Sequence, residues 1–188
     1  MSVWVTRVAP YHIALLERLT MLGASPEHVP LVAIQPLELD PASHQIVYNL
    51  DRYDHVVFVS RTAIDFALPL FEGLWPQWPD RQTWWTMGPG SADLLGKHHA
   101  KVRYAAPSTS EGLLAQLRDR DLRDEKWLVV RGQGGRELLR DSLVERGAQV
   151  DYLELYRREP LEISEKKMAS VTTIFVSSTQ NLLSLKQF

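Results

Sequence analysis

The stretch from Trp127 to Pro160, WLVVRGQGGRELLRDSLVERGAQVDYLELYRREP, predicts one βαβ unit. The apolar run Trp127 to Val130 is typical of a buried strand, and the apolar spacing from Arg136 to Glu145 is that of an amphipathic helix. Gly147 is a suitable helix stop. The segment Val150 to Tyr156 then predicts a second strand.

Two repeats run through the chain. Four residues of the unit recur in the segment VWVTRVAPYHIALLERLTMLGASPEHVPLVAIQP, each 124 positions earlier: Arg7, Gly23, Ala24 and Pro36 match Arg131, Gly147, Ala148 and Pro160. HVVFVSRTAIDFAL, from His55, is echoed 117 positions later by TTIFVSSTQNLLSL, from Thr172. Solenoid repeats have periods of about 20–50 residues, so these longer periods predict two similar lobes.

Composition narrows the class of protein. The 188 residues carry a net charge of −2 and no cysteine, which indicates an ordinary globular chain without thiolate or disulfide chemistry. No apolar run is long enough for a membrane helix, and the first strand pattern follows Met1 directly, so we expect a cytoplasmic protein. Without a basic stripe, nucleic acid is not the expected partner.

Strand and helix patterns alternate along the chain, which predicts parallel sheets covered by helices. Strands are expected at Val29 to Ile34 and Thr83 to Met87, and helices from Ala92 and Leu113. Polar residues gather where strands end and helices begin, and helix N-termini at such places bind anions. These predicted corners are Arg7, Ser60 to Thr62, Gly88 to Ser91, Ser108 to Ser110, Arg131 to Gly135 and Ser177 to Thr179. Two lobes facing one another would make a cleft.

Each corner has a plainer interpretation. Serine and threonine at such junctions commonly cap the helix. The glycine-rich loop Arg131 to Gly135 lacks the Lys-Ser/Thr of a P-loop, so nucleotide binding is disfavoured. His98 and His99 have no carboxylate at ligand spacing, and we interpret them as a surface helix end instead of a metal site.

The chain as a whole resembles the uroporphyrinogen-III synthase family. The resemblance rests on motifs in order along the chain: Val5-Thr6-Arg7; Tyr53-Asp54; Phe58-Val59-Ser60; Gly88; Ser91-Ala92; Thr109 to Leu114; Arg131-Gly132; Gly135 to Leu139; Arg146 to Ala148; Val150; Tyr156 to Arg158; and Phe175 to Ser178. Each motif is weak alone, but their order and spacing together are specific. Ser91 departs slightly, because the family more often has threonine there.

The resemblance implies an α/β fold of two lobes with parallel sheets flanked by helices and a two-stranded linker ribbon. Residues 1–35 and 164–188 would form a discontinuous first lobe, residues 42–157 the second lobe, and residues 36–41 and 158–163 the linkers. Carrying the repeat forward places further strands of the first lobe beyond Phe188, so we expect that lobe to be incomplete here.

The resemblance also implies a cofactor-free and metal-free reaction that closes hydroxymethylbilane and inverts its last ring. Tyr156, whose phenol keeps its proton at neutral pH, is the expected proton donor, and Ser91 is the second expected catalytic residue. The substrate carries eight carboxylates, which suits main-chain, hydroxyl and guanidinium donors. The expected substrate-binding residues are Arg7, Ser60, Arg61, Thr62, Gly88, Ser110, Arg131, Gly132, Arg136, Ser177 and Ser178, with Arg131 and Arg136 near the rim.

Two other functions remain open at this point. One is a non-catalytic two-lobed module of the periplasmic-binding type, and the other is a homologue that binds a tetrapyrrole or small anion without turning it over. For the enzyme we expect a monomer that receives hydroxymethylbilane in a transient hand-over from hydroxymethylbilane synthase.

Overall fold

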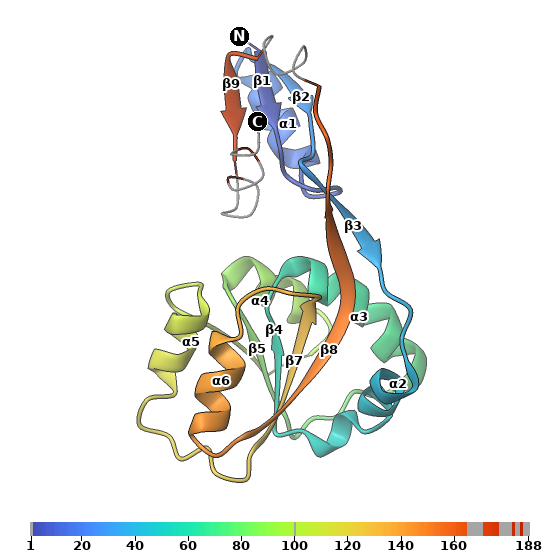
Figure 1. The fold of residues 1–188 in the computed structure, drawn as a ribbon, viewed down its shortest axis with the longest axis vertical. Coiled ribbons are helices and arrows are strands. Elements are labelled where there is room, and N and C mark those ends of the chain that lie inside the picture. The colour runs from blue at the N-terminus through green and yellow to red at the C-terminus, as the bar shows by residue number, and fades with distance from the viewer. Residues whose placement is uncertain (1, 100, 165–170, 177–181, 183–184, 186–188) are drawn as a thin grey trace. The chain divides into compact units, whose positions relative to one another are not determined.

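The computed structural model of the protein describes residues 2–99, 101–164, 171–176, 182 and 185. The chain divides into two compact units, one formed by residues 1–35 with 158–188 and the other by residues 36–157. Figure 1 shows parallel strands accompanied by helices in both. The predicted class, α/β with parallel sheets flanked by helices, is therefore confirmed.

The first unit holds a three-stranded parallel sheet. Strand β1 (Ser2–Val5) lies between β2 (Ser25–His28) and β9 (Thr173–Phe175), and helix α1 (Ile13–Met21) connects β1 to β2. A small core of buried apolar side chains supports it: Trp4, Val29, Leu31 and Ile163. The repeat predicted from the sequence is visible in the strand pairing. Strand β1 pairs with β2 and β9, and in the second unit β7 (Lys126–Gly132) pairs in the same way with β8 (Gln149–Pro160) and β4 (His55–Phe58).

The predicted strand from Val29 to Ile34 is wrong in its position. The partner of β1 is the polar segment Ser25–His28, and the following apolar residues form a separate strand, β3 (Val32–Pro36), of the other sheet. Pro30 stands between the two strands, and proline cannot donate to a strand ladder. The apolar composition of residues 29–34 therefore predicted the wrong partner for β1.

The second unit is built on a sheet in the order β3-β8-β7-β4-β5-β6. Its other elements, in chain order, are α2 (Pro41–Tyr48), a 3-10 turn (Leu50–Arg52), β4 (His55–Phe58), α3 (Arg61–Leu74), β5 (Thr83–Thr86), α4 (Pro89–Leu95), β6 (Val102–Tyr104), α5 (Ser110–Gln116), β7 (Lys126–Gly132), α6 (Leu138–Glu145) and β8 (Gln149–Pro160). The pairs from β8 to β6 are parallel. The bonds Leu37 N to Leu155 O and Leu161 N to Leu31 O run in opposite order, so β3 lies antiparallel to β8.

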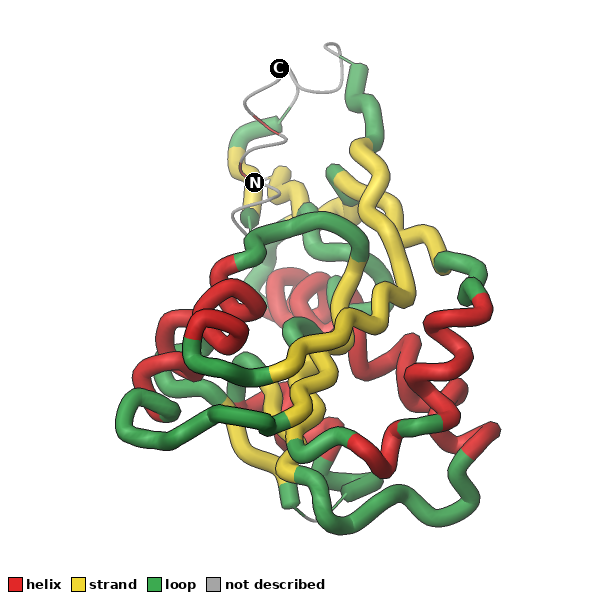
Figure 2. Tube along the Cα trace, turned by 60° about the horizontal axis from the view of Figure 1, so that its bottom comes forward, coloured by secondary structure: helices red, strands yellow, loops and turns green. Residues whose placement is uncertain are grey.

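Helices cover both faces of this sheet (Figures 1 and 2). Successive strand residues point to opposite faces, so Val57 packs in a cluster with Leu139 and Leu143 of α6, whereas Phe58 contacts Phe71 of α3 edge to face. Both faces are apolar, as expected for central parallel strands. Each fully buried large apolar side chain contributes about 1.5–3 kcal/mol to folding.

Candidate functional site

The sheet of the second unit reverses its direction of growth between β4 and β7. From β4 the chain adds β5 and β6 on one side, then returns to place β7 and β8 on the other side. The connections that leave β4 and β7 therefore diverge, one to α3 and the other to α6, on opposite faces of the sheet. In open α/β sheets ligands bind at the carboxyl ends of the strands at such a switch point.

Ser60 and Tyr156 meet at this switch point. Ser60 is the N-cap of α3, and its Oγ accepts a hydrogen bond of 3.0 Å from the Ala63 amide. The Tyr156 hydroxyl, from β8, lies 2.9 Å from the same Oγ. Tyr156 is fully buried, and its ring stacks on Phe66 of α3 at a centroid distance of 5.6 Å. The structure thus joins two predicted site residues that are 96 positions apart.

Gly132, at the end of β7, lies against the ring of Tyr156. A Cβ atom at this position would come within 2.5 Å of Cε2 of Tyr156, which is closer than real Cβ contacts. Glycine is therefore required here for close packing. The next amide, of Gln133, donates a 2.7 Å hydrogen bond to the Tyr156 carbonyl and ties the loop to β8.

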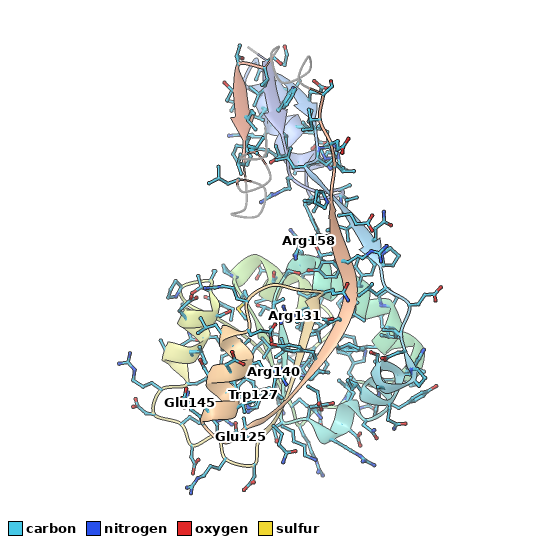
Figure 3. All side chains as sticks on the ribbon, in the orientation of Figure 1. Glu125, Trp127, Arg131, Arg140, Glu145 and Arg158 are labelled. Atoms are coloured by element: carbon cyan, nitrogen blue, oxygen red, sulfur yellow. The ribbon has the colours of Figure 1, made fainter. Side chains whose placement is uncertain are left out.

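Arg131 is buried, not at the rim as predicted. Its side chain folds over the loop that follows β7, where Nε donates to the Gly132 carbonyl at 3.1 Å and Nη2 donates to the Gly134 carbonyl. Gly134 and Gly135 have φ angles of +74° and +104°, which allow the loop to curl around the guanidinium. Figure 3 shows Arg131 at the carboxyl end of β7, with Trp127 near the start of the strand. Its contacts support the loop directly; contact with substrate stays a prediction.

Glu137 and Tyr152 complete the support of Arg131. Glu137 Oε1 lies 3.1 Å from Arg131 Nη1, and Glu137 Oε2 accepts a 2.6 Å hydrogen bond from the Tyr152 hydroxyl. That hydrogen bond lowers the pKa of Glu137, and burial raises the pKa of Tyr152 to about 12. The Arg131 guanidinium also lies over the Tyr152 ring, 4.5 Å from its centre. Neither residue was predicted from the sequence, although their place beside the loop and on the next strand was a usable signal.

The ends of β5 and β6 bring Gly88 next to Ser108. A Cβ atom on Gly88 would lie 2.8 Å from Ser108 Oγ, so the two loops touch. The helices predicted from Ala92 and Leu113 begin earlier, α4 at Pro89 and α5 at Ser110.

Ser91 and Ser110 therefore lie within the first turns of helices, not in the loops before them, and both are half-buried. The plainer interpretation holds for Thr109, whose hydroxyl caps α5 by accepting from the Gly112 amide at 3.1 Å.

Arg136 is exposed and pairs with Glu111 of α5, and its place at the rim of a substrate cleft stays a prediction. The paired guanidinium lowers the pKa of Glu111 to about 2. The other predicted residues of this corner, Arg61 and Thr62, occupy the first turn of α3, where Arg61 is exposed and Thr62 is half-buried.

The three remaining predicted residues belong to the first unit. Arg7 follows β1 in the first unit and is exposed, and Ser177 and Ser178 lie outside the described residues. The Arg7 carbonyl accepts a 2.8 Å hydrogen bond from His28 Nε2, and the His28 ring stacks on His12 at 3.5 Å. Burial and the neighbouring His28 lower the pKa of His12. Nothing in the spacing of these two histidines indicated their contact.

A metal centre finds no support in the part of the chain that is described, where no three His, Asp or Glu side chains gather at ligand distances. His98 follows α4 at the surface and pairs with Glu72 at 2.9 Å, as expected for a helix end. The same prediction is wrong for His99, which is 8% exposed and bonded to the chain on both ring nitrogens. Among the described helices, none has the length and apolar character needed to cross a membrane.

Comparison with known proteins gives a consistent result. The family model described as Uroporphyrinogen-III synthase HemD matches residues 13–185. The chain is 32% identical to the uroporphyrinogen-III synthase of Proteus mirabilis over 84% of this chain and 80% of that protein. It is 29% identical to the Escherichia coli enzyme of the same name, over 98% of this chain and 78% of that protein.

Solved structures agree on the fold. A uroporphyrinogen III synthase structure from Thermus thermophilus matches with a TM-score of 0.62 at 19% identity, over 85% of this chain. The Helicobacter pylori structure matches all of this chain with a TM-score of 0.53 at 17% identity. The chain spans 63% of the length of the Thermus chain and 77% of that of the Helicobacter chain.

Proposed function

The chain belongs to the uroporphyrinogen-III synthase family, and we propose that it catalyses the reaction that names the family. In this reaction hydroxymethylbilane loses water and closes to a macrocycle in which ring D is inverted, a hydro-lyase step of tetrapyrrole biosynthesis. The observation that carries the proposal is the Ser60–Tyr156 hydroxyl pair, 2.9 Å apart, at the switch point of the sheet. The pair offers a protic group where an α/β sheet binds its ligand.

The first step requires a proton. The bond between carbon and oxygen of the terminal hydroxymethyl group breaks, the oxygen leaves as water, and a protonated, cationic azafulvene remains. We assign the proton to Tyr156 and its delivery to Ser60, because Tyr156 is fully buried whereas Ser60 is half-buried and nearer to a substrate. Ser91 keeps its predicted place as a second hydroxyl near the reacting group.

The later steps depend more on the orientation of the reacting rings than on general acid catalysis. The substituted carbon of ring D attacks the azafulvene to give a spiro intermediate, which fragments and closes with ring D inverted. The proton released when the macrocycle closes restores the Tyr156 phenol. A general acid contributes about 10²–10⁴ in rate, whereas holding reacting groups in place can supply about 7–11 kcal/mol. Control of conformation is therefore the larger part of the task.

The hydrogen-bond donors around the switch point bind the carboxylates of the substrate. The first turn of α3 presents main-chain amides and the exposed Arg61, and Arg136 stands on the neighbouring connection before α6. Helix N-termini favour anions, since their first amides lack partners within the helix and the helix dipole is positive there. Gly88, Ser110 and Gly132 complete this set in the second unit. For Arg7, Ser177 and Ser178 of the first unit, substrate binding is proposed from the family resemblance alone.

Three further properties belong to the same proposal. The protein acts as a monomer in the cytoplasm, and it receives hydroxymethylbilane from the synthase that makes it. The reason for a hand-over is chemical, because free hydroxymethylbilane closes without inversion when no enzyme holds it. The residues assigned above use no metal or cofactor in any step.

An isomer assay tests the proposal. Hydroxymethylbilane is generated in place by its synthase, the protein is added, and the oxidised type I and type III porphyrins are separated. We expect an excess of type III over a reaction without the protein. Type I alone would overturn the proposed activity, and tight tetrapyrrole binding in that case would support the non-catalytic alternative.

A further inference from the structure

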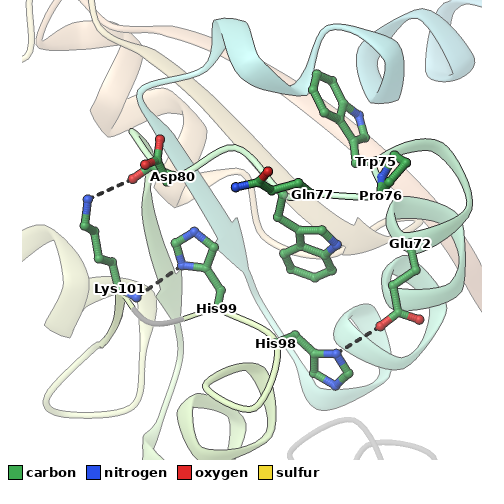
Figure 4. Close-up of a pocket in the computed structure, with 9 residues that line it drawn as sticks. Glu72, Trp75, Pro76, Gln77, Asp80, His98, His99 and Lys101 are labelled. Atoms are coloured by element: carbon green, nitrogen blue, oxygen red, sulfur yellow. Dashed lines mark hydrogen bonds and ion pairs between the residues drawn. The ribbon is translucent and has the colours of Figure 1, made fainter.

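A pocket lies at the end of the same sheet that is opposite Ser60 and Tyr156. It opens beside the C-terminal ends of α3 and α4, near the starts of β5 and β6, and has a volume of about 490 Å³. Its lining is shown in Figure 4 and consists of Glu72, Trp75, Pro76, Gln77, Trp78, Asp80, His98, His99 and Lys101. Ser60 and Tyr156 lie at the carboxyl ends of the strands, so this pocket is separate from the proposed active site.

Aromatic rings form one wall of the pocket in a near-parallel series. Trp78 stacks on the buried Trp84 at 5.0 Å and 26°, and His98 follows Trp78 at 6.1 Å and 20°. Trp75 is fixed by a 2.8 Å hydrogen bond from its Nε1 to the Val47 carbonyl. A flat ring can extend such a series, since offset-stacked rings attract beyond their buried area.

The charges around these rings favour a cation. Glu72 and Asp80 bring two carboxylates, against one ammonium from Lys101. The ammonium donates to the Asp80 main-chain carbonyl at 2.9 Å, and Figure 4 shows Lys101 and Glu72 on opposite sides of the pocket. Glu72 bonds His98 through Oε1, at 2.9 Å, which leaves Oε2 for a second donor. Indole faces also attract cations.

The histidine at the base of the pocket has a defined tautomer. The Lys101 amide donates to Nδ1 of His99 at 3.1 Å, so Nδ1 carries no proton, and Nε2–H donates to the Pro79 carbonyl at 3.1 Å. Burial lowers the pKa of His99, which keeps the ring neutral. His99 therefore adds no positive charge that would repel a cationic ligand.

From this arrangement we propose that the pocket binds a flat aromatic cation. The ring of the ligand packs against the aromatic side chains of the lining, Trp75, Trp78 and His98, and an amidinium or similar planar cation donates to Glu72. The volume suits a ligand of one or two rings, because small-molecule pockets begin at about 300 Å³. The site recognises a ligand chemically unlike the polycarboxylate substrate, so it does not depend on the proposed reaction.

Two probes of equal size and opposite charge test the proposal. Benzamidine and benzoate are titrated against the whole protein while tryptophan indole resonances are followed by NMR. We expect saturable benzamidine binding with a Kd on the order of 1 mM, and no saturation with benzoate at tenfold higher concentration. Equal binding of both probes, or no saturation with benzamidine, would overturn the assignment.

Variants locate the binding. E72Q keeps the shape of an exposed side chain and should weaken benzamidine about five- to tenfold, because a charge-assisted hydrogen bond becomes a neutral one. E145Q, on the exposed end of α6, is the matched control and should leave the Kd unchanged. Benzamidine binding that is the same in E72Q and the parent protein would place the ligand elsewhere.

Discussion

The hydroxyl of Tyr156 lies 2.9 Å from Oγ of Ser60, the residue that caps helix α3. Ser60 Oγ already accepts from the Ala63 amide, so the helix end, the serine and the phenol form one hydrogen-bonded chain. Through this chain a buried phenol reaches the carboxyl edge of the sheet. The chemistry proposed above depends on both hydroxyls being present.

Removing either hydroxyl should lower the rate of type III formation by a similar factor. Y156F deletes the proton donor and S60A deletes the group that passes the proton on, and we expect each to reduce kcat about 10²-fold. S60A should also cost about 1 kcal/mol of folding free energy, because the cap of α3 is lost. Kinetics with hydroxymethylbilane generated in place and urea unfolding measure the two effects.

The double variant separates a relay from two independent effects. If the hydroxyls act in series, S60A/Y156F should be little slower than either single variant, whereas independent effects would multiply. Y48F changes an exposed tyrosine of α2 and should leave kcat unaltered. Full activity in S60A beside a slow Y156F would mean that Tyr156 donates without Ser60.

G132A should disturb the same pair from the strand side. The new Cβ would lie 2.5 Å from the Tyr156 ring, which is held by Phe66, so we expect a loss of about 1–3 kcal/mol and a reduced kcat. A Cβ added at Gly73, in α3, would meet no atom within 4 Å, so G73A should gain up to about 1 kcal/mol from helix propensity. Equal urea midpoints for the two variants would contradict the proposed contact.

The sequence was informative wherever a local pattern and a tertiary contact agreed. The unit from Trp127 to Tyr156 and the strand before Ser60 are apolar because both faces of the sheet are covered, so periodicity and burial gave the same prediction. Polar residues at strand ends likewise pointed to the switch point, since parallel strands end along one edge. Ser60 and Gly132 were predicted in this way, whereas Tyr156 was predicted from the family resemblance.

Other features depend on contacts that no spacing encodes. The run Val29 to Ile34 looks like one strand, but Pro30 divides it and the polar Ser25–His28 pairs with β1. Arg131 was expected at a rim because a cleft bordered by a few arginines suits a substrate with eight carboxylates. Its burial follows from four partners that only the folded loop brings together, namely the Gly132 and Gly134 carbonyls, Glu137 and Tyr152.

R131K should therefore destabilise the loop after β7, although it keeps the positive charge. Lysine keeps the positive charge but cannot reach the Gly132 carbonyl, the Gly134 carbonyl and Glu137 together. We expect a loss of about 2–3 kcal/mol, because hydrogen bonds to a charged group contribute about 1.5–3 kcal/mol each.

The kinetic consequence of R131K should be a raised KM for hydroxymethylbilane with a smaller change in kcat, as expected for a residue that positions a binding loop. R123K alters an exposed ion pair with Asp121 and should change stability by less than about 1 kcal/mol. Parent-like urea midpoint and KM in R131K would show that the loop does not need its arginine.

His55 should make the protein sensitive to acid. The ring is 2% exposed at the start of β4, where Nδ1 accepts from Trp85 Nε1 at 3.2 Å, and burial with the nearby Arg120 lowers its pKa to about 4. The unfolded chain takes up a proton near pH 6.5 while the folded protein does not, so the free energy of unfolding should fall from pH 6.5 to pH 4, by about 3 kcal/mol in all. H55Q should flatten this dependence in urea unfolding, whereas H44Q, on the surface of α2, should keep it. A parent protein equally stable at pH 7 and pH 4.5 would contradict a neutral buried ring.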